Sequence, residues 1–128
     1  MDVVTINWCS PSPDDIDLEM MPNLNKPILI GEFHFGAAER GYFHGGRRMV
    51  GNQEDRALAL ENYYLDALHH PLIVGAHWFQ YAAQPTSGRR DGEAFQIGLI
   101  DIADNPYPET RDAIRRVGDV LYNFRYDN

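Results

Sequence analysis

The stretch that decides the fold is Lys26-Pro27-Ile28-Leu29-Ile30-Gly31-Glu32-Phe33-His34-Phe35-Gly36. An apolar run behind a proline is typical of a strand buried on both faces, and Gly31 lets another backbone approach closely. The run ends in a carboxylate. A polar residue at the carboxyl end of a buried parallel strand is costly to the fold, so in a βα barrel this position more often serves catalysis. Glu32 is therefore the first candidate for chemistry.

The composition indicates one folded unit with a neutral partner. The 128 residues are 44% hydrophobic, which is enough for one domain with its own core. A net charge of -8 argues against nucleic acid and against an anionic membrane, because both bind clustered Lys and Arg. Cys9 is the only cysteine, which excludes an intrachain disulfide. We find no apolar run of about 18 residues and no basic-then-apolar leader, so we expect neither a membrane span nor an export signal.

Strands and helices are predicted to alternate along the chain. The predicted strands are residues 2–8, 27–33 and 72–79, with a short helix at 14–21 and a short extra strand at 96–102. Asn52 caps a helix that closes before Pro71, and an amphipathic helix begins near Pro108. Long loops, 36–51 and 80–105, follow the second and third strands. This order predicts an α/β fold with three parallel βα units.

Several loop motifs occur in a recognisable order. They are Gly31-Glu32-Phe33-His34-Phe35-Gly36-Ala37, Arg40-Gly41-Tyr42-Phe43-His44, Gly75-Ala76-His77-Trp78-Phe79-Gln80-Tyr81, Gln84-Pro85, Gly88-Arg89, Asp91-Gly92-Glu93, Gln96-Ile97-Gly98 and Asp101-Ile102. With these motifs the chain resembles the C-terminal end of agarase-like retaining glycoside hydrolases. The resemblance implies that residues 1–128 are a single domain, equivalent to the sixth to eighth βα units of a (β/α)8 barrel. The expected fold is therefore a partial TIM-barrel-like α/β fold.

The resemblance also implies roles for individual residues. Glu32 corresponds to the nucleophile of a retaining mechanism, and Trp78 to the aromatic platform on which a sugar ring stacks. The acid/base glutamate of the family lies on the fourth barrel strand, which has no counterpart in this chain. The peptide bond after Trp78 is expected to be cis, as in related barrel glycosidases.

The substrate-binding candidates are polar and aromatic side chains at strand ends and in the two long loops. Glu32 and His34 are two residues apart, so they point to one face of their strand, and His77 is expected on the neighbouring strand. We therefore expect Glu32, His34, His77 and Trp78 to lie in one cleft. The full set of substrate-binding candidates is His34, His44, His77, Trp78, Gln80, Gln84, Asp91 and Glu93. No metal or other cofactor is predicted.

These features predict a glycoside-hydrolase-related protein that acts on or binds a polysaccharide such as agarose. Retaining hydrolysis needs two carboxyl groups roughly 5 to 5.5 Å apart, so the sequence leaves open whether this chain is an enzyme by itself. One alternative is a noncatalytic carbohydrate-binding or structural remnant. Another is a metal-dependent hydrolase in which Glu32, His34 and His77 bind Zn or Mn.

The predicted partners are a carbohydrate and a second copy of the chain, with no nucleic acid and no membrane. Three parallel strands leave two sheet edges and one sheet face open, so we expect a homo-oligomer, most simply a twofold dimer. The family that the chain resembles is commonly secreted, but the sequence itself does not indicate a cellular location.

Overall fold

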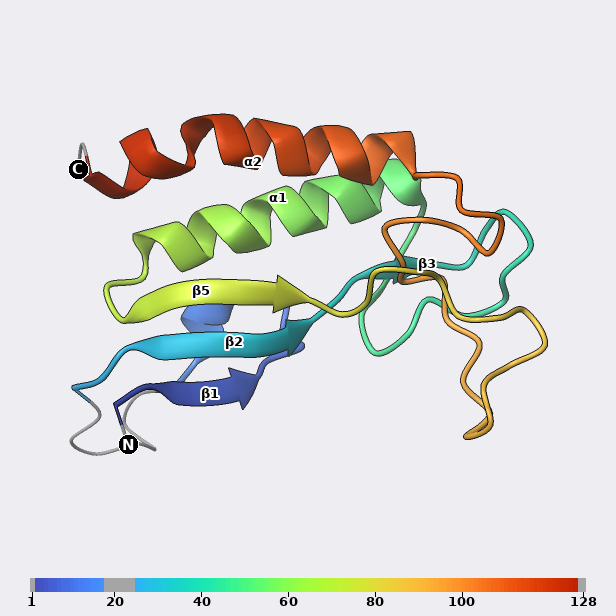
Figure 1. Cartoon of the computed structure of the whole chain (residues 1–128), viewed down its shortest axis with the longest axis horizontal. Helices are drawn as coiled ribbons and strands as arrows, with labels where there is room; N and C mark the ends of the chain where they lie inside the picture. Colours follow the sequence, from blue (N-terminus) through green and yellow to red (C-terminus); the bar gives the residue numbers. More distant parts are fainter. Residues whose placement is uncertain (1, 18–24, 127–128) are drawn as a thin grey trace.

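A three-stranded parallel sheet organises the molecule. The computed structural model describes residues 2–17 and 25–126. The sheet has the order β1-β2-β5, with β1 at Val4–Asn7, β2 at Ile28–Phe33 and β5 at Ile73–Trp78 (Figure 1). Both strand pairs are parallel. The α/β class and the parallel arrangement are thus confirmed.

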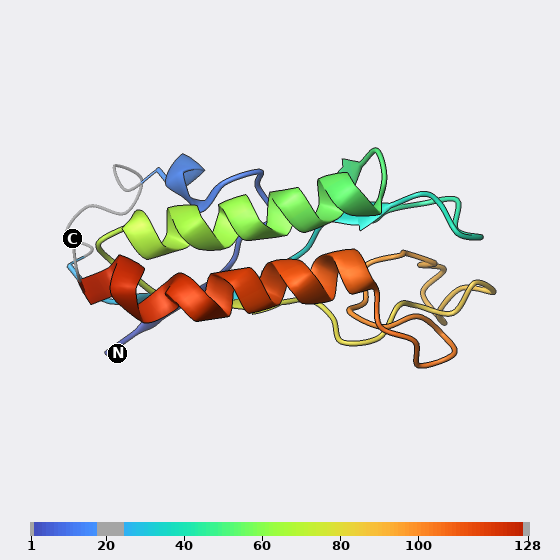
Figure 2. The same ribbon diagram turned by 90° about the horizontal axis from the view of Figure 1, so that it is seen from above.

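Two long helices lie side by side above the strands. Helix α1 spans Gln53–His69 and helix α2 spans Pro108–Tyr126 (Figure 2). The side chain of Asn52 accepts a hydrogen bond from the Asp55 N–H, which satisfies one of the free donors in the first turn of α1. The Asn52 cap predicted for α1 and the start predicted for α2 near Pro108 are confirmed.

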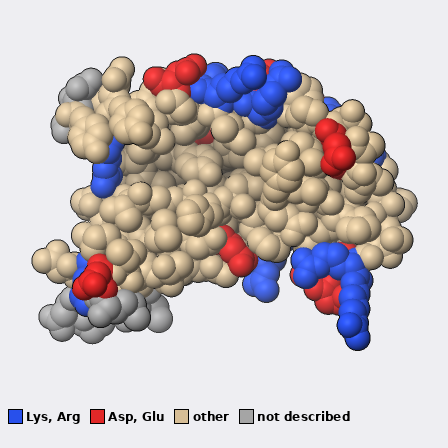
Figure 3. All heavy atoms as spheres, viewed as in Figure 1, with Lys and Arg blue, Asp and Glu red and all other residues tan. Residues whose placement is uncertain are grey.

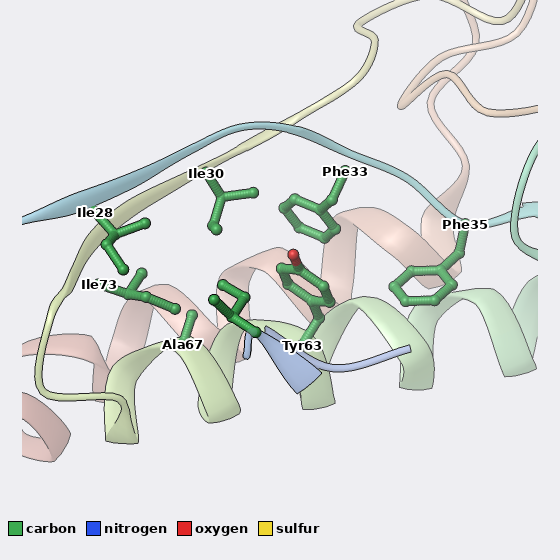
Figure 4. Packing of buried hydrophobic residues seen from close by; sticks show 8 residues of the cluster. Ile28, Ile30, Phe33, Phe35, Tyr63, Ala67 and Ile73 are labelled. Atoms are coloured by element: carbon green, nitrogen blue, oxygen red, sulfur yellow. The ribbon is translucent and has the colours of Figure 1, made fainter. Parts of the chain in front are cut away.

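The core forms between β2, β5 and α1, where Ile28 and Ile30 are two residues apart and a register shift after Ile30 brings Phe33 to the same face. Ile28, Ile30 and Phe33 are fully buried on the side of the sheet that faces α1 (Figure 4). The Phe33 ring stacks on Tyr63 of α1, with ring centroids 3.9 Å apart. Each fully buried side chain of this size contributes about 1.5–3 kcal/mol, so these few contacts fix the position of β2 against α1.

The helix predicted at residues 14–21 falls only in part on the described chain, and there a 3-10 turn takes its place. A 3-10 turn, η1, spans Pro13–Asp15, and residues 18–24 lie outside the described part of the chain. The Ser12 hydroxyl donates a hydrogen bond to Asp66, which ties η1 to α1.

Both long loops pass beyond the carboxyl ends of the strands. The first loop contains the short strands β3 (Gly36–Ala37) and β4 (Met49–Val50), which pair in parallel. The strand predicted at residues 96–102 does not form. Ile100 makes only isolated bridges, to Ala82 and to Pro106. Its segment contacts two different parts of the chain and does not pair with either over several residues, so no ladder forms.

Two further observations concern the backbone. The prediction of a cis peptide bond after Trp78 is wrong by one position. The non-proline cis bond joins Phe79 to Gln80. Among the described residues, neither long helix has an apolar stretch long enough to cross a membrane.

Candidate functional site

A hollow of about 690 Å³ lies at the carboxyl ends of β1 and β2. The residues after β1 form one wall, the end of β2 forms the floor, and the two long loops form the remaining walls. The lining residues are Asn7, Trp8, Cys9, Ser10, Glu32, His34, Arg47, Arg48, Phe79, Arg89, Glu93 and Phe95. In open parallel sheets ligands bind at this end of the strands, so this hollow is the candidate functional site.

Glu32 lies on β2 at the floor of the hollow and is partly exposed. It pairs in register with Asn7 of β1, and its carbonyl oxygen accepts a hydrogen bond from the Trp8 N–H. A Cβ atom on Gly31 would lie 2.7 Å from the Asn7 Oδ1, so the glycine gives Asn7 its place beside β2. Within the described residues, no side chain or N–H donates a hydrogen bond to the Glu32 carboxylate.

His34 is a neutral hydrogen-bonding residue in this hollow. Its side chain is only 5% exposed, and its Nε2 accepts a hydrogen bond from the Arg47 N–H at 3.0 Å. Burial, followed by the positive charge of Arg47, lowers the pKa of His34 to about 4. At neutral pH the proton therefore lies on Nδ1, which is buried without a partner among the described residues.

The turn above His34 requires glycine. Gly46 has a φ of 81°, and a Cβ atom there would lie 2.7 Å from the His34 Nε2. The ring and the turn are thus held in contact.

Glu93 also lines the hollow, from a loop in which Gln84 holds it. The Gln84 amide is fully buried, donates to a Glu93 oxygen at 2.9 Å and accepts from the Phe95 N–H. Arg89 lies 3.4 Å from the same carboxylate oxygen. Gln84 was predicted to bind substrate, but its side chain has no exposed surface. Its contacts make it a residue that positions Glu93.

A buried polar cluster joins both loops to α1. Arg56 and Gln53 on α1 and Gln96 in the second loop are all fully buried. Arg56 donates to the carbonyl oxygens of Phe35 and Gly98 and to the Gln53 side chain, which in turn donates to Gln96. A buried guanidinium with all these acceptors holds the two loops at fixed positions.

Within each of the two loops, backbone also touches backbone directly. A Cβ atom on Gly98 would lie 1.8 Å from the Ala83 nitrogen, and one on Gly36 would lie 2.1 Å from the Gly45 oxygen. Only glycine fits at these two positions.

The other predicted substrate-binding residues lie outside this hollow. Trp78 packs edge-on against Phe33, and its Nε1 donates to the Ile97 carbonyl. His77 is exposed and lines a separate hollow beside β5. The expectation of one cleft for Glu32, His34, His77 and Trp78 is therefore wrong for the last two. The reason is that Trp78 faces the helices together with Phe33, its partner in the sheet register.

Three more candidates make contacts within the loops. His44 is exposed, and its Nδ1 accepts a hydrogen bond from the Gly46 N–H. Gln80 donates to the Ala82 carbonyl. Asp91 is exposed and pairs with Arg89 at 2.7 Å. None of these three residues lines the described hollow, although Asp91 orients an arginine that does.

The aromatic walls were not identified from the sequence. Trp8, Phe79 and Phe95 line the hollow, in place of the predicted Trp78. Trp8 comes directly after β1. The strand-end criterion that selected Glu32 could therefore also have selected Trp8. Phe95 carried no comparable signal because it lies in an irregular loop.

Beta-agarases are similar to this chain in sequence and in structure. The chain is 42% identical over 111 residues to Beta-agarase B and 40% identical over 106 residues to Beta-agarase A, both of Vibrio sp. (strain JT0107). The homologues of this chain are beta-agarases. The crystal structure of an agarase superposes on 98% of the chain with a TM-score of 0.93 and 37% identity. An exo-beta-agarase structure covers 99% of the chain with the same TM-score. No protein-family model matches the chain.

The match covers only part of each agarase. The chain spans 12% of Beta-agarase B, 11% of Beta-agarase A and 20% of the agarase crystal structure. The resemblance to agarase-like proteins is confirmed, and the chain matches one segment of these larger proteins.

Proposed function

We propose that this chain forms the nucleophile side of a retaining glycoside hydrolase site for a polysaccharide such as agarose, with Glu32 as the nucleophile. The observation that carries the proposal is the position of Glu32. Its carboxylate lies at the carboxyl end of a parallel strand, in a hollow, within a chain whose homologues are beta-agarases. A carboxylate in that place can attack an anomeric carbon, because the hollow leaves room for a sugar ring beside it.

The walls of the hollow suit a sugar. Trp8, Phe79 and Phe95 supply apolar surfaces for the faces of sugar rings, and Arg47 and Glu93 supply hydrogen-bonding groups for hydroxyls. We propose that Gln84 and Asp91 support this site by holding Glu93 and Arg89, and that His34 and Glu93 border it.

The acid/base group is proposed to come from outside these residues. Glu93 is the second carboxylate in the hollow, but Gln84 and Arg89 both contact one of its oxygens. Its contacts with Gln84 and Arg89 hold this carboxylate against its own loop, whereas a general acid must reach the leaving oxygen of the substrate. In keeping with this, we propose that residues 1–128 are one domain corresponding to three βα units of a partial TIM barrel.

A chimera tests the role of Glu32 in the presence of an acid/base group. The segment of Beta-agarase B that aligns with this chain is replaced by the chain, and agarose cleavage is measured. We expect activity in the chimera, its loss in Glu32→Ala, and partial recovery with azide as an external nucleophile. Glu54→Gln, a change of an exposed carboxylate on α1, serves as the control. An active chimera whose Glu32→Ala variant cleaves agarose at the parent rate would refute the proposal.

Two other functions were considered. A noncatalytic carbohydrate-binding protein would use the same hollow, and the azide experiment separates it from a hydrolase because only a hydrolase forms a glycosyl azide. The metal-dependent alternative has less support, because Glu32 and His34 line one hollow and His77 lines another. The described residues contain no cluster of three or more His, Cys, Asp or Glu side chains placed to hold a metal ion.

A further inference from the structure

The hollow around Glu32 is basic, although the chain as a whole is acidic. Three arginines and two glutamates line the hollow, whereas the full sequence has a net charge of -8. His34 adds no charge at neutral pH, because burial lowers its pKa to about 4. A hollow with an excess of one sign of charge attracts ligands of the opposite sign. The charge of this hollow therefore indicates a ligand with a negative group.

Part of this charge is neutralised within the second long loop. Arg89 lies 3.4 Å from a Glu93 oxygen and 2.7 Å from an Asp91 oxygen. Figure 3 shows basic and acidic side chains together at the lower right, where this loop lies in the same view (Figure 1). The charges that remain in the hollow belong to the first long loop and to Glu32.

The Arg48 guanidinium is held in place while part of it stays available. Its Nε donates a hydrogen bond to the Cys9 carbonyl oxygen, in the wall that follows β1. Among the described residues, no group accepts a hydrogen bond from its two terminal nitrogens, and no carboxylate pairs with it. The terminal N–H groups of a guanidinium match two oxygens of a carboxylate or a sulfate. Arg48 is thus oriented for an anionic group in the hollow.

Arg47 adds a second positive charge to the same wall. Its backbone N–H donates to the His34 Nε2 at 3.0 Å, and its guanidinium has no partner within the described part of the chain. Burial raises the pKa of the Cys9 thiol, and the positive charges of Arg47 and Arg48 counteract this rise. The negative charge of Glu32 also acts on this thiol. Both arginines and Glu32 are therefore near Cys9, so a group bound by the arginines would lie near Glu32.

We propose that the hollow binds a sugar unit with an anionic substituent, a sulfate ester or a carboxylate, with Arg48 as its main partner and Arg47 as the second. This inference rests on the function proposed above and narrows the polysaccharide to one that carries anionic groups. Hydrogen bonds between charged groups are roughly twice as strong as neutral ones. A neutral sugar would leave both guanidinium groups without a counter-charge.

Calorimetric titration of the chain compares three probes at one low ionic strength. They are a sulfated agar-type oligosaccharide, the same oligosaccharide after removal of its sulfate groups, and an oligogalacturonide, which carries carboxylates. We expect at least one anionic probe to bind about tenfold more tightly than the desulfated one, and added salt should weaken that binding. The anionic probe that binds more tightly identifies the substituent. The inference is overturned if the desulfated probe binds as tightly as both anionic probes, or if the chain binds none of the three.

Substitutions show which arginines carry this preference. Arg48→Met should remove most of it, and Arg47→Met should reduce it. Arg90→Met is the matched control, because Arg90 is an exposed arginine of the second long loop that does not line the hollow. If Arg90→Met lowers the preference as much as Arg48→Met does, general charge attraction explains the binding and the inference is wrong.

Circular dichroism shows whether each variant is folded. If Arg48→Met is unfolded, Arg47→Met decides the test with the same control. Arg47 binds His34 through its backbone N–H, so this substitution leaves that hydrogen bond in place. An Arg47→Met variant that is folded and keeps the full preference would then contradict the inference.

The titrations also separate this inference from the proposed hydrolase function. Glu32→Gln removes the proposed nucleophile but keeps both arginines, so the preference for the anionic probe should remain. If the preference remains but the Glu32→Ala chimera cleaves agarose at the parent rate, the hydrolase proposal alone fails. If the chimeras behave as expected but the chain shows no preference, the inference drawn here alone fails.

Discussion

Replacing Arg56 with methionine is expected to lower the free energy of unfolding by about 3 kcal/mol. The Arg56 guanidinium is fully buried between the rings of Trp78 and Tyr107. It donates to the carbonyl oxygens of Phe35 and Gly98 and to the Gln53 side chain. Methionine retains much of the length of arginine but donates no hydrogen bond, so three buried acceptors lose their partner.

The magnitude follows from two opposing terms. A buried acceptor left without a donor costs about 1–3 kcal/mol, so three such acceptors cost about 6 kcal/mol together. Against this, burial lowers the pKa of Arg56 from 12.5 to about 10. That difference corresponds to about 3 kcal/mol of net cost for keeping the charge inside the protein, which the variant recovers. The difference of about 3 kcal/mol is a large part of the stability of a domain of this size.

Urea unfolding followed by tryptophan fluorescence measures the change. Arg116→Met is the control, because Arg116 is an exposed arginine paired with Glu61, and such surface pairs contribute at most about 1 kcal/mol. Hydrogen exchange should also show faster exchange in both long loops of Arg56→Met. If Arg56→Met is as stable as Arg116→Met, Arg56 does not hold the loops as we infer.

Three further predictions concern the hollow. As pH falls from 6.5 towards 4, the free energy of unfolding should fall by up to about 3 kcal/mol. The reason is that His34 in the unfolded chain takes up a proton, whereas the folded imidazole, with its pKa of about 4, does not. In melting curves recorded over this pH range, His34→Gln should remove this part of the pH dependence. Gly46→Ala should destabilise more than Gly41→Ala in chemical unfolding, because both have positive φ but only Gly46 contacts His34; equal losses would show that contact with His34 adds nothing. The isolated chain should hardly cleave agarose-type oligosaccharides, since loss of a general acid alone costs about 10²- to 10⁴-fold; cleavage at an ordinary enzyme rate that Glu32→Gln abolishes would contradict this.

The regular elements could be predicted because their signals are local. The apolar run of β2 and the Asn52 cap of α1 each depend on a few adjacent residues, and both occur where expected. The extra strand at 96–102 failed because an alternating apolar pattern does not say whether a neighbouring strand is available. In the structure Ile100 meets two different segments, so no ladder continues.

The candidate site was predicted only in part, for a related reason. Strand-end position identified Glu32 and His34, which line the hollow. It failed for Trp78, because the direction of that side chain depends on register shifts between β2 and β5 that the sequence does not reveal. The role of Gln84 was also hidden, since a buried glutamine in a loop looks the same in sequence as an exposed one.

The close contacts of Gly98 with Ala83 and of Gly36 with Gly45 have a consequence for how the hollow can vary. At these points backbone touches backbone, so the path of each loop there does not depend on the side chains at the rim. Substitutions of rim residues such as Phe95 or Arg47 can therefore change which ligand is accepted while the scaffold beneath stays in place. Variation in ligand preference among related proteins is then expected at the rim, and these glycines are the positions that such variation must leave untouched.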